Sequence, residues 1–187
     1  MTGLIVLKGS EWMKQLLDGE RDFSRVKIVG GNMVLDYMKE INRYLSAANL
    51  EKEPLIFDRA DISGVHAPAI YAPFTRLRGV RAPYANFASA YMEHSDFGPY
   101  VNANGSETCS ILWSATLDNA NMEHSIFRKA RLKNASVKKT NFSHADLYGV
   151  TDWETMKMLG TVNDFDVKVD EYGHDMLARA KAHKILV

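Results

Sequence analysis

The chain has 187 residues, a length that suits one domain with modest additions. Its 23 basic side chains equal its 23 acidic ones, which argues against a polyanion-binding protein driven by overall charge and against a strongly acidic mimic of nucleic acid. The single cysteine, Cys109, excludes an internal disulfide framework and indicates a reducing compartment, so we expect a cytoplasmic protein. The apolar run Leu4–Leu7 is too short for a signal-peptide core or a membrane span, so we expect no membrane contact.

Residues 1–50 are predicted to form an N-terminal capping segment. Ser10 can cap a short helix over Glu11–Asp18. The stretch Glu20–Ser24 looks like one unit of the repeat described below, but lies off its register. An amphipathic helix is predicted over Asn32–Ala48, where it would interrupt a coil after a partial first turn. Its apolar stripe consists of Val34, Tyr37, Met38, Ile41, Tyr44 and Leu45.

Residues 51–150 carry a five-residue register. Every fifth residue from Phe57 to Leu147 is mostly apolar, and the residue two positions earlier is mostly small. A period of five matches neither a helix nor a flat strand, so it indicates a repeat architecture. One large and one small inward position per unit demand a narrow interior, which the chain can fill only by stacking units on successive turns. The clearest run of large positions is Leu117, Met122, Phe127, Leu132, Val137, Phe142 and Leu147.

Units such as Ala60–Gly64 resemble the consensus A-[D/N]-L/F-x-x of the pentapeptide-repeat family, and the resemblance covers about residues 55–150. It implies an all-β solenoid: a right-handed quadrilateral β-helix, here with added N-terminal and C-terminal helices. Four repeats would form the four sides of one coil, so residues 20 apart would stack. Pro68, Pro73 and Pro83 each follow a large position, which favours corners there.

The register fails in one place. Asn102 and Glu107 occupy large apolar positions, and Gly105 occupies a small one. A buried glutamate without a partner would cost several kcal/mol. We therefore predict a loop over 98–108 that leaves the coil, with the coil resuming at Ser110.

Residues 151–187 are predicted to form a C-terminal cap of helix and strand. Thr151–Glu154 reads as a capping box, which predicts a helix over Asp152–Leu159. The alternation over Phe165–Val169 predicts a half-buried strand, and residues 174–185 look helical. These segments would cover the open end of the coil. A homodimer formed through an end cap stays an open alternative.

Motifs for catalysis are missing from the sequence. It contains no nucleotide loop, zinc motif or nucleophile elbow, so we expect neither an enzyme nor a bound cofactor or metal. His124 and His144 are 20 apart and would stack at one corner, above Asn104 and Tyr84, while the other histidines show no such spacing. Two imidazoles ~5 Å apart could share a metal, but without a third ligand a solvated corner is the favoured interpretation.

Six basic residues and no acidic ones lie between Ser125 and Ala145. Coil geometry would spread them over three of the four sides, and no aromatic side chains are interleaved with them. We therefore expect a solvated surface rather than a nucleic-acid patch, and nucleic acid is an unlikely partner. The six are Arg128, Lys129, Arg131, Lys133, Lys138 and Lys139.

Stacking by 20 would also gather apolar side chains on one outer side. Tyr71, Tyr91 and Ile111 would form a column, with Phe74 and Trp113 beside it. A stripe of this size should not be left in water. The favoured interpretation is that the helix over 33–48 covers it; the alternative is a surface for a protein partner or a dimer.

Three functions are consistent with the sequence. The first is a non-enzymatic scaffold or interaction module, a rigid rod that displays side chains and a loop to a protein partner. The second follows from the resemblance: some members of the family mimic duplex DNA and modulate gyrase, a topoisomerase, in the manner of quinolone resistance. The third is a basic-surface nucleic-acid binder. The sequence identifies no particular partner.

Overall fold

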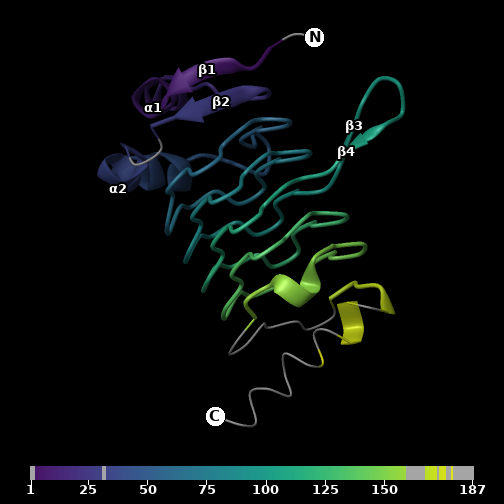
Figure 1. Cartoon of the computed structure of the whole chain (residues 1–187). Coiled ribbons are helices and arrows are strands. Elements are labelled where there is room, and N and C mark those ends of the chain that lie inside the picture. Colours follow the sequence, from purple (N-terminus) through teal and green to yellow (C-terminus); the bar gives the residue numbers. More distant parts are fainter. Residues whose placement is uncertain (1–2, 31–32, 159–166, 172, 176–177, 179–187) are drawn as a thin grey trace.

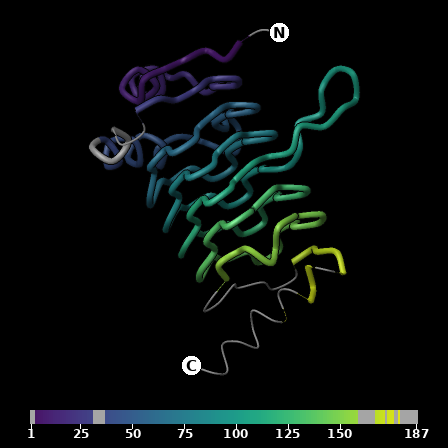
Figure 2. The backbone as a smooth tube through the Cα atoms, in the orientation of Figure 1, coloured from purple at the N-terminus to yellow at the C-terminus, as the bar shows by residue number. Residues whose placement is uncertain are grey.

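The computed structural model of this chain describes residues 3–30, 33–158, 167–171, 173–175 and 178 (Figure 1). Its named elements are β1 (Ile5–Lys8), α1 (Gly9–Leu17), β2 (Val26–Val29), α2 (Met33–Ala47), β3 (Tyr100–Val101), β4 (Glu107–Thr108) and the 3-10 turn η1 (Trp153–Thr155). Between them the backbone winds in stacked coils, from the N-terminal elements at one end to η1 at the other (Figure 2). None of the described helices is long and apolar enough to cross a membrane.

Parallel bridges hold the coils together. Ile56 bridges Arg76, and Tyr71 bridges Tyr91, so the expectation that residues 20 apart stack is confirmed where no residues are inserted. The bridges fall into four columns, one for each side of the coil. We name them the Ile56 side (Ile56, Arg76, Asp96, Ile126, Asp146), the Asp61 side (Asp61, Arg81, Ile111, Arg131, Thr151), the His66 side (His66, Asn86, Thr116, Ser136, Lys157) and the Tyr71 side (Tyr71, Tyr91, Asn121, Asn141).

Each side ends in a tight turn. In the turn after Phe57, the Ala60 N–H donates to the Phe57 carbonyl at 3.0 Å, and Arg59 has a left-handed φ of 58°. A positive φ at the third residue alone is the geometry of a type II turn, which favours proline at the second residue. Pro68, Pro73 and Pro83 occupy that second position, so the prediction that they mark corners is confirmed.

The core is the narrow interior of the coil. Phe97 stacks on Phe127 with ring centroids 4.6 Å apart, and Phe127 meets Phe142 edge-on. The small positions are buried too, and their hydroxyls bond to the backbone: Thr140 Oγ1 donates to the Leu117 carbonyl at 2.7 Å. Serine and threonine therefore replace alanine inside the coil without leaving a polar atom unsatisfied.

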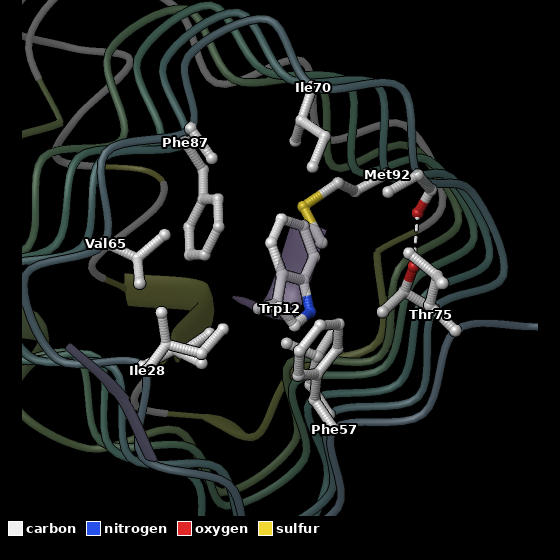
Figure 3. Close-up of a pocket in the computed structure, with 13 residues that line it drawn as sticks. Trp12, Ile28, Phe57, Val65, Ile70, Thr75, Phe87 and Met92 are labelled. Atoms are coloured by element: carbon white, nitrogen blue, oxygen red, sulfur yellow. Dashed lines mark hydrogen bonds between the residues drawn. The ribbon is translucent and has the colours of Figure 1, made fainter. Parts of the chain in front are cut away.

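The N-terminal end is closed by α1. Trp12 is buried at the centre of the coil, over Phe23 and Phe57 (Figure 3). Behind it a cavity of about 40 Å³ is lined by apolar side chains such as Ile28, Val65 and Phe87. The helix predicted over Glu11–Asp18 is present, but it begins at Gly9, so Ser10 is not its cap; the Lys8 N–H donates to the Glu11 carboxylate at 2.8 Å instead.

An additional helix explains why Glu20–Ser24 is off register. Asp22 bridges Ile56, which is 34 positions further along rather than 20, because α2 and its connections lie between them. The unit around Phe23 is therefore a true coil unit, whose ring stacks on Phe57 at 5.4 Å. The predicted amphipathic helix is present as α2, which buries Ile41 and Leu45 completely.

The helix predicted over Asp152–Leu159 is wrong in its described part. The chain forms only the single turn η1, and Lys157 then bridges Ser136 as part of the coil. In the capping box Thr151 would be the N-cap and Asp152 the first helical residue, but Asp152 has a left-handed φ of 68°, so the α-helix cannot start there and the box cannot act. Of the strand predicted over 165–169, the described residue Lys168 bridges Asp146. Most of the helix predicted over 174–185 lies outside the described residues, although Glu171, residues 173–175 and Ala178 are helical.

Candidate functional site

A β-hairpin projects from the corner that follows the Ile56 side (Figure 1). β3 pairs antiparallel with β4, with Tyr100 opposite Thr108 and Val101 opposite Glu107. The predicted loop over 98–108 therefore leaves the coil as expected, and it is an ordered hairpin. Its tip turns at Gly105, whose N–H donates to the Asn102 carbonyl at 2.9 Å.

The hairpin adds ten residues to one coil. Arg81 bridges Ile111 and Asp96 bridges Ile126, so partners across the hairpin are 30 positions apart, not 20. The two ends of the insertion meet at the base, where Ser110 Oγ donates to the Gly98 carbonyl at 3.2 Å. On every side of the coil, the residues that stack across the hairpin are therefore not the ones that a uniform spacing of 20 predicts.

Residues of neighbouring coils hold the base of the hairpin on both sides. The guanidinium groups of Arg59 and Arg78 lie 5.2 and 5.9 Å from the centre of the Tyr100 ring, within cation–π range. On the other side Lys129 Nζ lies 2.6 Å from Glu107, and the hydrogen bond to this carboxylate raises the pKa of Lys129. Gly79 leaves room for the hairpin, because a Cβ there would stand 2.9 Å from both the Thr108 carbonyl oxygen and Tyr100 Cβ.

A groove beside the hairpin carries four guanidinium groups and two carboxylates. Asp58 is 3% exposed, and its Oδ2 lies 2.8 Å from both Arg76 Nε and Arg78 Nη2. The hydrogen bond to Asp58 raises the pKa of Arg78. The surplus of positive charge suits this groove to an incoming carboxylate. Its lining residues are Asp22, Ser24, Arg25, Asp58, Arg59, Arg76, Arg78 and Tyr100.

No pattern in the amino-acid sequence indicated this groove. Its arginines come from three different coils, and the insertion before Ile56 hides that Arg25 stacks in line with Arg59. Only the off-register unit Glu20–Ser24 pointed to a further coil on that side.

The expected column of Tyr71, Tyr91 and Ile111 is wrong beyond Tyr91. Because of the hairpin, Tyr91 bridges Asn121, whereas Ile111 bridges Arg81 on a different side. Trp113 lies with Ile111, beneath the guanidinium of Arg131 at 5.0 Å. The five residues therefore do not form one stripe.

Helix α2 contacts the coil at Tyr71, the first residue of the expected column. Asn42 donates to the Ala69 carbonyl at 2.8 Å and accepts the Tyr71 N–H at 2.9 Å. Tyr71 and Phe74 are half-buried against the core, whereas Tyr91 is 52% exposed. A role of these residues in binding a partner stays a prediction.

The histidine corner differs from the prediction in its neighbours. His124 and His144 stack with ring centroids 4.7 Å apart, as their spacing of 20 indicated. Beneath them lie His94 and Phe74 instead of Asn104 and Tyr84, with centroid separations of 4.8 Å. The spacing of 30 between His94 and His124 concealed this third imidazole from the sequence.

The basic run between Ser125 and Ala145 is spread over several sides and is partly engaged. Arg128 Nη2 lies 2.7 Å from Asp146, Lys129 pairs with Glu107, and Arg131 covers Trp113. These contacts neutralise or shield half of the six cations. The exclusion of nucleic acid remains a prediction.

Residues 115–151 match the family model described as pentapeptide repeats, with eight copies. The resemblance to pentapeptide-repeat proteins is thereby confirmed, and the chain contains that family's repeat. No curated protein matches the chain in sequence.

Several solved structures are similar to this chain. A trypsin-treated variant of QnrB1, described as a plasmid-mediated fluoroquinolone resistance protein, is 18% identical with a TM-score of 0.36, over 86% of this chain and 80% of QnrB1. Rfr23, a pentapeptide-repeat protein from the cyanobacterium Cyanothece 51142, is 17% identical with a TM-score of 0.26, over 71% of this chain and 96% of its own. HetL from Nostoc sp. strain PCC 7120, involved in heterocyst differentiation regulation, is 12% identical with a TM-score of 0.21, over 87% and 94%.

Proposed function

We propose that this protein is a non-enzymatic scaffold, a right-handed quadrilateral rod that binds a protein partner through the hairpin β3–β4 and the arginine groove beside it. One observation carries the proposal: the hairpin is exposed at Val101 and over residues 103–108 but held at its base by contacts from coils on both sides. Val101, on its outer part, is 61% exposed. A cytoplasmic location, favoured by the single cysteine, belongs to the same proposal.

Physical chemistry supports this choice of surface. A loop whose base is already fixed loses less conformational entropy when it binds a partner. Arginine and tyrosine are enriched among the residues that contribute most to interfaces. Because the groove offers more guanidinium groups than carboxylates, the partner segment that suits it is acidic, with carboxylates that can pair in a bidentate manner with Arg59.

Excision of the hairpin is the direct test. Deleting residues 100–109 and changing Pro99→Gly would leave Phe97, two glycines and Ser110, which restores a two-residue corner able to adopt positive φ. A second variant, Arg59→Glu, reverses the charge at this one position and so removes the surplus of positive charge in the groove. Lys139→Glu is the matched control, since it is an exposed corner residue on the His66 side.

The readout is cross-linked capture from the native host, followed by binding of the purified partner. We expect one partner that the native chain and Lys139→Glu both capture. The hairpin-free chain and Arg59→Glu should each fail to capture it. Equal capture by the native and hairpin-free chains would contradict it.

One feature favours a second candidate, a modulator of gyrase: the chain combines a repeat rod with a projecting loop. The zero net charge and the arginine groove speak against mimicry of DNA. A supercoiling assay that gave neither inhibition nor protection from quinolones would eliminate this candidate.

A further inference from the structure

The histidine corner of the Tyr71 side combines imidazoles with carboxylates. Two units share the residues Met-Glu-His-Ser, at 92–95 and 122–125, and the hairpin brings them onto adjacent coils. The next coil contributes His144 above His124. Three imidazoles and two glutamates therefore line one edge of three successive coils.

Three of these side chains offer donor atoms at one point. One oxygen of Glu123 and one ring nitrogen each of His124 and His144 lie within 4.8 Å of one another. His124 Nε2 is 3.7 Å from Glu123 Oε1. The donors of a tetrahedral zinc ion lie roughly 3.3–3.5 Å apart, so the set must close by about 1 Å. His124 is exposed and its terminal torsion is broad, so rotation of the ring supplies this movement at low energy.

The charge around this corner also favours a cation. The four stacked units of this side, 71–75, 91–95, 121–125 and 141–145, contain no lysine or arginine. Glu93 Oε1 accepts a hydrogen bond from Asn121 at 2.8 Å, and Asn141 Nδ2 lies 3.4 Å from Glu123 Oε2. Within the described part of the chain, Glu93 Oε2 is buried and has no hydrogen-bond partner. A buried carboxylate oxygen without a donor is unfavourable, and a nearby cation would offset this.

We propose that Glu123, His124 and His144 bind one divalent transition-metal ion of the zinc class. Two imidazoles and one carboxylate are a donor set that zinc accepts, with a water molecule as fourth ligand, whereas calcium and magnesium prefer oxygen alone. The ion would join the coil of Glu123 to the coil of His144 and act as a staple between them. Glu93 and His94, on the coil below, would add negative charge and a stacking surface.

Titration calorimetry of the tag-free full chain with zinc chloride at neutral pH tests this proposal. We expect one ion per chain with micromolar or tighter affinity, and a rise in the thermal midpoint because the ion binds only the folded state. Replacement by cobalt(II) should give the visible absorption of a tetrahedral site. His124→Asn and Glu123→Gln should each weaken binding at least ~10-fold, because even the loss of a residue that only supports a metal ligand has an effect of that size. His66→Asn is the control, because His66 lies on another side, beside Asn86.

Three results would overturn the assignment. The native chain could fail to bind zinc at millimolar concentration. His124→Asn could bind with native stoichiometry and affinity. Binding could instead be lost with His174→Asn, which would place the ion in the C-terminal segment. If His124→Asn lowers the thermal midpoint without metal, His144→Gln replaces it as the test variant.

Discussion

The imidazole rings of His94 and His124 stack 4.8 Å apart although 30 positions separate the two residues. Elsewhere in the uninterrupted coil, stacked partners are 20 positions apart, as Ile56 and Arg76 are. The difference is the hairpin, whose ten residues lie outside the coil and leave the alignment of the coils above and below unchanged. The hairpin thus decides which side chains meet without being part of the core.

Removal of the hairpin should therefore change stability little. In the variant that lacks residues 100–109 and carries Pro99→Gly, we expect a free energy of unfolding within about 1 kcal/mol of the native value, because exposed ion pairs contribute little and a shorter loop closes at lower entropic cost. Urea denaturation followed by circular dichroism measures this. A loss of several kcal/mol would show that the hairpin supports the coil.

Gly79→Ala should disturb the hairpin base. A Cβ at Gly79 would stand 2.9 Å from the Thr108 carbonyl oxygen and Tyr100 Cβ. Gly64→Ala is the matched control, since Gly64 has a similar φ of +68° with nothing within 4 Å of its Cβ. Both variants incur the left-handed backbone penalty, so overpacking should make Gly79→Ala the less stable by about 1–3 kcal/mol. Hydrogen exchange should also accelerate in β3 and β4, and equal behaviour of the two variants would contradict the packing.

Asp58→Asn should destabilise the coil beneath the groove. The carboxylate is 3% exposed and pairs with both Arg76 and Arg78, whose side chains are 39% and 36% exposed. We expect a loss of about 1.5–3 kcal/mol, the range for hydrogen bonds to charged groups. Asp61→Asn is the control: its ion pair with Lys27 is long, at 4.0 Å, and the asparagine oxygen can still accept the hydrogen bonds from Ser63, so this change should cost under about 1 kcal/mol. Chemical denaturation compares the pair, and a larger effect at Asp61 would refute the ranking.

Phe127→Ala should be among the most damaging single changes. Its ring is fully buried, and its centroid lies 4.6 Å from that of Phe97 and 5.5 Å from that of Phe142. Truncation of such a side chain costs about 3–5 kcal/mol. The neighbouring Ile126 is 40% exposed, so Ile126→Ala should cost roughly 1 kcal/mol or less. Similar losses for both variants would show that the assignment of inward and outward positions is incorrect.

Asp96 should make stability depend on pH. Burial raises the pKa of this carboxyl, and the hydrogen bond that it accepts from the Gly98 N–H offsets part of this rise. The folded chain therefore holds the proton more tightly than the unfolded one, so the contribution of Asp96 is greatest below the unfolded pKa and is lost as the pH rises through the folded value. Asp96→Asn removes this titration, so the stability of the variant relative to the native chain should be higher at pH 7 than at pH 3. Urea unfolding at both pH values measures the difference, and a difference independent of pH would contradict it.

The five-residue register determined much of this structure by itself. Each unit must bury one large side chain, and this local requirement fixed the inward positions, the proline corners and the place where Asn102 and Glu107 force the chain out of the coil. The amphipathic stripe likewise predicted α2, because its period differs from that of the coil. The capping box at Thr151 misled, since the ladder between Lys157 and Ser136 prevailed over local helix propensity.

What only the tertiary structure decided is the set of neighbours between coils. Stacking depends on how many residues lie outside the coil between two units, and the sequence does not state how much of a loop or helix is excluded. The insertion before Ile56 placed Arg25 beside the groove, and the hairpin moved Ile111 away from Tyr91 and brought His94 beneath His124. The five-residue period is a property of the individual units. The groove and the histidine corner, in contrast, form only because bridges hold separate coils together.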